Sequence, residues 1–111
     1  MSATPHPLHL QRCSHQQGPA LTPAAMQPLL GQLDDGWALA DGRLSKTFKT
    51  ADFHRTMALV NAIAWIAHEQ DHHPDLQVGY NRCTVQWSTH SVGGLSINDF
   101  ICAARIDALW A

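Results

Sequence analysis

The sequence of 111 residues has few charged side chains and no cluster of them. Asp, Glu, Lys and Arg make up 14% of the chain, and the formal net charge is −2 with neutral histidines. The Lys and Arg residues are scattered along the chain. Because direct binding to nucleic acid or to an anionic membrane needs a basic patch, the sequence argues against both. A sparsely charged surface also suggests that other subunits cover part of it.

Cysteine and long apolar segments are scarce as well. Cys13, Cys83 and Cys102 form no C-x-x-C pair, so no disulfide framework is expected and the chain fits a reducing cytoplasm. The N-terminus lacks a cationic segment followed by an apolar run, so no signal peptide is predicted. The longest apolar stretch, residues 57–67, is interrupted by Asn61 and is too short to span a bilayer.

The length and composition indicate one domain. A typical domain has about 100–150 residues, and the hydrophobic content of 45% is enough for one compact core. Residues 1–20 are rich in Pro, Gln, Ser and His, which predicts a flexible N-terminal arm with solvated histidines and a solvated Cys13. Residues 21–111 form the predicted domain.

The first half of this domain has the pattern of a helix followed by a hairpin. Thr22 and Pro23 are typical of an N-cap and a first helical position, and apolar residues recur at helical spacing to about residue 33. Residues 37–39 and 44–49 have strand character, and Asp41-Gly42 is a turn signal between them.

The second helix has the clearest pattern. Thr50 or Asp52 is the expected cap, and the helix is predicted to run to about Asp71, since Pro74 prevents it from continuing. Its apolar residues recur every three or four positions and predict one buried stripe. This stripe consists of Phe53, Met57, Val60, Ile63, Ala64 and Ala67.

A second hairpin and a last helix complete the domain. Residues 76–80 and 83–89 alternate between apolar and polar side chains around a turn. Ser96 and Asp99 have the spacing of a capping box at the start of a C-terminal helix. The predicted order is α-β-β-α-β-β-α. We therefore expect an α+β fold in which three helices pack on one face of a four-stranded antiparallel sheet.

Three histidines lie where these elements end. His72 and His73 follow the second helix, and His90 follows the last strand, beside a loop that contains Gly93-Gly94. Imidazole titrates near neutral pH, and the partial negative charge at a helix C-terminus favours its protonated form. The sequence has no Ser-His-Asp or Cys-His signature and no phosphate-binding glycine loop. We therefore predict general acid–base catalysis by His72, His73 and His90.

An alternative uses the same segment. Residues 68–72 match H-E-x-x-H, the zinc metalloprotease motif, in which His68 and His72 would bind zinc and Glu69 would activate water. The helix that has to carry this motif is expected to stop before Pro74, and the short pentapeptide also recurs by chance. A zinc hydrolase is therefore the weaker hypothesis.

Several short motifs recur at a characteristic spacing between residue 37 and the C-terminus. They are Asp71-His72-His73-Pro74-Asp75, Tyr80-Asn81-Arg82, Ser88-Thr89-His90 and Gly94-Leu95-Ser96 with Asp99. In the spacing of the double histidine, the third histidine and the closing aspartate, the chain resembles the pterin-4a-carbinolamine dehydratase family.

The resemblance implies dehydration of 4a-hydroxytetrahydropterin to quinonoid dihydropterin, in the recycling of the pterin used by aromatic amino acid hydroxylases. It also implies a homodimer or homotetramer and neither a metal nor an organic cofactor. The family's three histidines correspond to His72, His73 and His90. The implied pterin contacts are Asp71, Pro74, Ser88 and Thr89, with Trp37 at the edge of the pocket.

The chain departs from the family pattern at one position. A glutamate usually stands four residues before the first histidine, where this sequence has His68, and Glu69 lies one residue further on. Either His68 substitutes for that carboxylate or the role is dispensable. Because some family members are transcriptional coactivators, a non-catalytic dimerisation module of the same fold is a further alternative.

Overall fold

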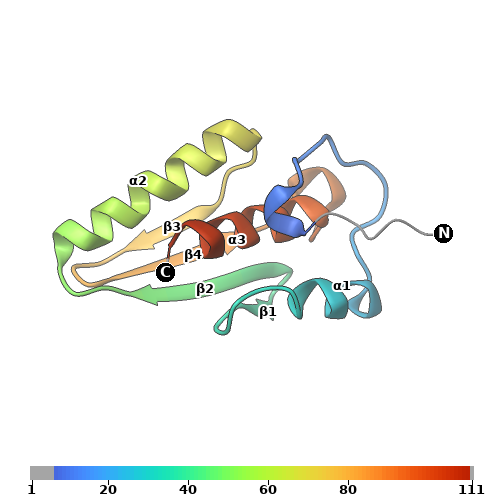
Figure 1. Ribbon diagram of the computed structural model, residues 1–111. Helices are drawn as coiled ribbons and strands as arrows, with labels where there is room; N and C mark the ends of the chain where they lie inside the picture. Colours follow the sequence, from blue (N-terminus) through green and yellow to red (C-terminus); the bar gives the residue numbers. More distant parts are fainter. Residues whose placement is uncertain (1–6, 111) are drawn as a thin grey trace.

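A computed structural model describes residues 7–110 (Figure 1). The helices and strands follow the predicted order α-β-β-α-β-β-α, and two short 3₁₀ helices, which were not predicted, are added to it. The α-helices are α1 (Pro23–Leu30), α2 (Phe53–Gln70) and α3 (Ile97–Leu109). The strands are β1 (Ala38–Ala40), β2 (Arg43–Lys49), β3 (Asp75–Val78) and β4 (Arg82–Trp87), and the 3₁₀ helices are η1 (Leu8–Leu10) and η2 (His90–Val92).

The four strands form one antiparallel sheet in the order β1-β2-β4-β3. Each predicted hairpin is present, and the two hairpins meet where β2 pairs with β4, with Leu44 opposite Trp87 and Phe48 opposite Cys83. Side chains of a strand alternate between its two faces, so these four residues lie on one face. All four are buried, which identifies this face as the side of the core.

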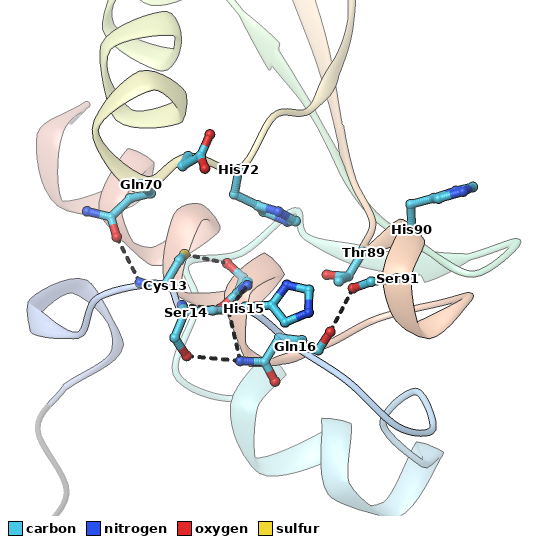
Figure 2. Close-up of a pocket in the computed structure, with 11 residues that line it drawn as sticks. Cys13, Ser14, His15, Gln16, Gln70, His72, Thr89, His90 and Ser91 are labelled. Carbon is cyan, nitrogen blue, oxygen red and sulfur yellow. Dashed lines mark hydrogen bonds between the residues drawn. The ribbon is translucent and has the colours of Figure 1, made fainter.

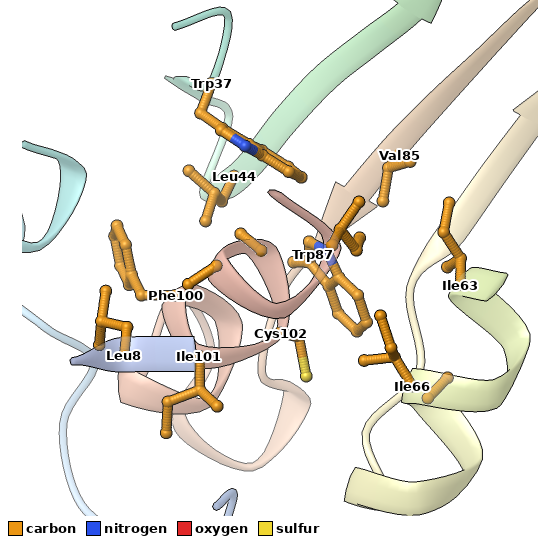
Figure 3. Close-up of a cluster of buried hydrophobic side chains, with 14 of the residues drawn as sticks. Leu8, Trp37, Leu44, Ile63, Ile66, Val85, Trp87, Phe100, Ile101 and Cys102 are labelled. Carbon is orange, nitrogen blue, oxygen red and sulfur yellow. The ribbon is translucent and has the colours of Figure 1, made fainter. Parts of the chain in front are cut away.

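The helices α2 and α3 cover that face, and the core lies between them and the sheet (Figures 1 and 3). Trp87 and Val85 of β4 pack there with Ile63 of α2 and with Phe100 and Ile101 of α3. The opposite face of the sheet is polar. On it, for example, Thr47 and Thr84 share a hydrogen bond of 2.8 Å between their hydroxyl groups.

The buried stripe of α2 differs from the predicted one. Ile63 and Ala67 are buried as expected, but Phe53 and Ala64 are exposed. The buried residues of the helix are Thr56, Leu59, Ile63, Ile66, Ala67 and Gln70. The prediction was wrong for Phe53 and Ala64, because the helix carries apolar residues on two adjacent faces and only the position of the sheet decides which face is covered.

The described part of the predicted arm, residues 7–20, packs against the domain. Leu8 is 2% exposed in a contact between η1 and α3. The Arg105 side chain donates to the Gln11 carbonyl, and the Ser91 hydroxyl donates to the Gln16 carbonyl at 2.9 Å. These contacts join the segment to parts of the chain that are far away in the sequence. His9 and His15 are exposed as predicted, whereas Cys13 is half-buried instead of solvated. The histidine at position 6 lies outside the described residues.

Within residues 7–110, every helix is too short or too polar to cross a lipid bilayer.

Candidate active site

The end of α2 turns the chain sharply and thereby positions His72. Asp71 adopts a left-handed conformation with φ 50°, and the His72 amide donates to the Ala67 carbonyl at 3.1 Å. The Asp71 amide donates to the His68 carbonyl at 3.3 Å. This pair of bonds is the Schellman motif, which ends a helix and satisfies its last carbonyls. His72 therefore leaves the helical path and its side chain turns toward α3.

His72 forms a short hydrogen bond with a buried carboxylate. The distance from His72 Nε2 to Asp99 Oδ1 is 2.6 Å, and the Asp99 side chain is fully buried. An ionised carboxylate can only accept, so Nε2 carries the hydrogen and donates it. Nδ1 is then the ring nitrogen that takes no part in the bond to Asp99. The ring also stacks on Trp87, with centroids 5.5 Å apart and an interplanar angle of 11°.

Asp99 holds together three segments that are distant in the sequence. Its Oδ2 accepts hydrogen bonds from Thr89 Oγ1 at 2.7 Å and from the Ser96 amide at 3.0 Å. The bond to Ser96 belongs to the predicted capping box of α3. The Thr89 hydroxyl donates to Asp99, so the Ser96 hydroxyl donates the 2.7 Å bond between these two side chains. The carboxylate thus connects the end of α2, the segment that follows β4 and the start of α3.

Two opposing effects act on the protonation of His72. Burial disfavours the charged ring and lowers its pKa, whereas the hydrogen bond and the negative charge of Asp99 raise it. Burial is the largest single effect, but the hydrogen bond and charge of Asp99, with smaller contributions from Cys13 and Asp71, together outweigh it, so the pKa of His72 lies above its ordinary value. The ring therefore stays protonated to a higher pH than a free histidine would.

A closed loop carries His90. The Thr89 amide donates to the Gly94 carbonyl at 2.7 Å, and this bond joins the two ends of the loop that contains η2. Gly93 has φ 68°, a left-handed conformation that glycine adopts without strain. His90 is exposed at the start of η2. His90 directly follows Thr89, whose hydroxyl is bonded to Asp99, so the closed loop keeps His90 close to Asp99.

A cavity of about 360 Å³ lies between these segments (Figure 2). It is within the size range of small-molecule sites, roughly 300–1,000 Å³. The end of α2, the loop after β4, the start of α3 and the N-terminal segment all contribute to its wall. The lining residues are Cys13, Ser14, His15, Gln16, Gln70, Asp71, His72, Thr89, His90, Ser91 and Asn98.

Four of the nine predicted site residues line this cavity: Asp71, His72, Thr89 and His90. In Figure 2 the His90 ring points away from His72. His90 also lines a smaller hollow of about 190 Å³, to which Ser88 belongs. His73 is exposed and Pro74 is partly buried, and neither residue lines either hollow.

Trp37 lies away from this cavity. It is buried, and its Nε1 donates to Asp107 Oδ1 at 2.9 Å. Asp107 and Asp99 are eight residues apart on α3, which corresponds to about 12 Å along the helix axis. The structure therefore does not bring Trp37 together with His72 and His90.

The residues of the H-E-x-x-H motif do not converge. The left-handed turn at Asp71 takes His72 off the helix, whereas His68 is exposed on it with its ring 6.1 Å from the Trp65 ring. The Glu69 carboxylate lies 3.7 Å from the Arg105 guanidinium. Among residues 7–110, His, Cys, Asp and Glu side chains form no group of three that is suited to a metal ion. The arrangement does not fit the zinc hypothesis.

Two parts of the site were not predicted from the sequence. Asp99 was assigned to the helix start, and its pairing with His72 depends on the approach of α2 to α3. The contribution of residues 13–16 was missed because their polar composition is typical of an arm. In the structure Ser14 is tied to Asn98, whose Nδ2 donates to the Ser14 carbonyl at 2.7 Å.

Comparisons with known proteins agree with this architecture. Residues 19–109 match the family model described as pterin 4 alpha carbinolamine dehydratase. A protein from Nitrosomonas eutropha, provisionally named a pterin-4-alpha-carbinolamine dehydratase, is 52% identical over 89% of this chain and 89% of its own. A protein of Stenotrophomonas maltophilia with the same provisional name is 53% identical over 93% of this chain and 91% of its own.

Two solved structures are also similar. A transcriptional coactivator/pterin dehydratase from Brucella melitensis superposes with a TM-score of 0.77 at 33% identity, over 83% of this chain and 99% of that chain. A pterin dehydratase-like protein identified as a RuBisCO assembly factor in the alpha-carboxysome superposes with a TM-score of 0.57 at 25% identity, over 67% of this chain and 88% of that chain. Since the family model spans both hairpins, α2 and α3, the chain belongs to the pterin 4 alpha carbinolamine dehydratase family.

Proposed function

We propose that the protein dehydrates 4a-hydroxytetrahydropterin to quinonoid dihydropterin and water. The observation that carries this proposal is the hydrogen bond of 2.6 Å between His72 and the buried Asp99 at the wall of the cavity. Such a pair holds the imidazole in one tautomer and one orientation. Membership of the family and the names of its relatives support the same reaction.

His72 is the proposed general acid. Loss of water requires a proton for the departing 4a-hydroxyl group, while the neighbouring N5–H loses its proton to a base and a C4a=N5 double bond forms. The raised pKa of His72 favours the protonated ring near neutral pH, which is the form that an acid needs. Nδ1 is the atom that delivers the proton, because Nε2 remains bonded to Asp99.

His90 is the proposed base, and His73 orients the pterin or shares the proton transfer. His90 lines both the main cavity and the adjacent hollow, and its outward ring in Figure 2 has to rotate toward the substrate. Rotation of an exposed side chain takes place within nanoseconds and does not limit turnover. Thr89 and Asp71, which line the cavity with His72, are proposed contacts of the pterin ring.

The remaining contacts rest on the family resemblance. Pro74 and Ser88 are proposed to contact the pterin beside His73 and His90. Trp37 and His68 lie outside the cavity of this chain, so their role would require a ligand or a second subunit that reaches beyond it.

We further propose that the protein works in the cytoplasm as a homodimer or homotetramer, without a metal or an organic cofactor, beside an aromatic amino acid hydroxylase. Exposed aromatic side chains support self-association. Phe53 is 49% exposed, Trp65 is 61% exposed, and Tyr80 stacks on Phe53 with centroids 6.5 Å apart. Sedimentation equilibrium measures the assembly state, and a monomer at all concentrations would contradict this part.

The activity is tested by following the decay of the carbinolamine at mildly alkaline pH, where the uncatalysed reaction is expected to be slow. The double variant His72→Ala/His90→Ala is expected to abolish the catalysed decay. The single variant His72→Ala should lose roughly 10²–10⁴-fold, the usual contribution of a general acid. His54→Ala, an exposed histidine near the start of α2, is the matched control and should keep full activity. Full activity of a folded double variant would refute the assignment.

A non-catalytic partner module is the second candidate, since one similar structure is named a coactivator/dehydratase and another an assembly factor. The same assay separates the two functions. A folded, unaltered protein without any effect on carbinolamine decay would favour the partner module.

A further inference from the structure

Two cysteines from opposite ends of the sequence meet beside the cavity. The Sγ atoms of Cys13 and Cys102 are 3.6 Å apart, although 89 residues separate them in the chain. Cys102 is completely buried in α3, and Cys13 is half-buried in the N-terminal segment. A disulfide bond has an S–S length of about 2.05 Å, so the two sulfur atoms need to approach by roughly 1.6 Å.

The N-terminal segment is held in place on both sides of Cys13. The Cys13 amide donates to Gln70 Oε1 at 2.9 Å, and the Ser14 amide donates to Asn98 Oδ1 at 3.2 Å. Cys13 Sγ also lies 3.6 Å from the Asn98 carbonyl oxygen. Because these bonds hold the backbone against α2 and α3, the two cysteines lie close together without any movement of the backbone. Rotation about the Cys13 side chain is the motion that remains.

The surroundings of the two thiols suit them to different chemical roles. The hydrogen bond from Cys102 lowers the pKa of Cys13, burial opposes this effect, and the positive charges of His72 and Arg105 add to it. The hydrogen bond to Cys13 and burial raise the pKa of Cys102. Since the thiolate is the nucleophile, Cys13 is the more reactive sulfur. Cys13 also lines the cavity, through which a small oxidant can reach it.

We propose that Cys13 and Cys102 form a peroxide-reactive dithiol, which a hydroperoxide converts into an intramolecular disulfide. The Cys13 thiolate attacks one peroxide oxygen, the O–O bond breaks, and a sulfenic acid and hydroxide form. Cys102 Sγ then attacks the sulfur of Cys13, its proton leaves with the departing oxygen, and the S–S bond forms. With hydrogen peroxide, two thiols lose two electrons and two protons, and two molecules of water are produced.

This modification is independent of the proposed dehydration and requires no pterin. Its product would fix the N-terminal segment covalently to α3 at the wall of the cavity. The third cysteine, Cys83, is buried in β4, and its pKa is raised by burial. Cys83 is therefore the internal reference that stays reduced in the folded protein.

The test is a mass and peptide map of the unaltered, reduced protein after exposure to hydrogen peroxide. Free thiols are blocked with N-ethylmaleimide in denaturant, and the chain is digested without reduction. Before blocking, the expected product is a single chain lighter by two hydrogen atoms. The map should then show the Cys13 and Cys102 peptides joined and Cys83 blocked. Dithiothreitol should restore the thiols of Cys13 and Cys102, as exchange with a dithiol reduces a disulfide.

Substitutions provide the matched controls. Cys13→Ser should abolish the link, whereas Cys83→Ser should still form it. A disulfide between two chains or one that includes Cys83 would refute the proposal. It would equally be refuted by sulfinic acid at Cys13 with Cys102 still reduced, or by three free thiols after treatment. The map of the unaltered chain decides among these outcomes even if a variant fails to fold.

Discussion

Asp99→Asn is the substitution that most directly probes the pair formed with His72. Asparagine keeps the shape of the side chain and removes its charge. Its amide oxygen can still accept from Thr89 Oγ1 and from the Ser96 amide, which lie 2.7 Å and 3.0 Å from Asp99 Oδ2. The amide nitrogen then faces His72 Nε2, and both are donors in the native tautomer. The imidazole must move its hydrogen to Nδ1 to accept this new bond.

The expected effect on His72 is a reversal of its pKa shift. Burial is the largest single effect and lowers the pKa of the ring, but the hydrogen bond and charge of Asp99, with smaller contributions from Cys13 and Asp71, together outweigh it in the native protein. Without the negative charge, burial remains as the main effect, so the pKa of His72 should fall below the ordinary value of about 6.5. The ring would then be neutral at pH 7.

The stability cost should depend on pH. A native pKa above the unfolded value stabilises the fold below about pH 6.5, and this contribution is lost as pH rises through the native pKa. In Asp99→Asn the sign is opposite, so protonation of His72 destabilises the variant as pH falls. Loss of a hydrogen bond to a charged group costs about 1.5–3 kcal/mol. We expect the variant to be less stable by about 2–4 kcal/mol at pH 6 and by clearly less at pH 9.

Two measurements check this prediction. Urea unfolding at pH 6 and pH 9 gives the difference in the free energy of unfolding between the two proteins. An NMR titration with ¹⁵N-labelled histidine follows the pKa and the tautomer of His72. Equal destabilisation at both pH values, or a His72 pKa that does not fall, would refute the argument that the charge of Asp99 controls this ring.

Two further predictions concern the N-terminal segment. Leu8→Ala should lower the free energy of unfolding by about 2–5 kcal/mol, the usual cost for a buried leucine, because Leu8 is 2% exposed. The control variant Leu10→Ala, at a site that is 60% exposed, should change the free energy of unfolding little. Equal urea midpoints for these variants would show that η1 adds nothing to the fold. Gly94→Ala would place a Cβ atom 2.8 Å from Cβ of Ala20 and should cost roughly 1–3 kcal/mol. The double variant with Ala20→Gly should recover most of this loss, and a failure to recover it would contradict the contact.

The site shows how far short motifs can predict a tertiary arrangement. His72 was expected at a helix end and His90 at a strand end, and the structure brings both to the wall of one cavity. This expectation was possible because helix termination at Pro74 and the glycines after His90 are local signals. The direction of each ring is not local. His72 turns toward Asp99, while the His90 ring points away in Figure 2.

The sequence by itself determined the elements, their order and their caps. The α-helix caps Thr22, Asp52 and Ser96 each accept a hydrogen bond within three residues, and both hairpins form between strands that are adjacent in the chain. Such contacts depend on neighbouring residues and on the period of the apolar pattern, so the chain encodes them locally.

Only the tertiary structure decided which face of α2 is buried, which residues surround His72, and where the N-terminal segment lies. Apolar residues on two faces of α2 satisfy the same helical period, and the sheet selects the face with Leu59 and Ile63. The contacts of Asp99 with His72 and of Cys13 with Cys102 join residues 27 and 89 positions apart. No local pattern encodes such pairs, because they form only when α2 and the N-terminal segment pack against α3.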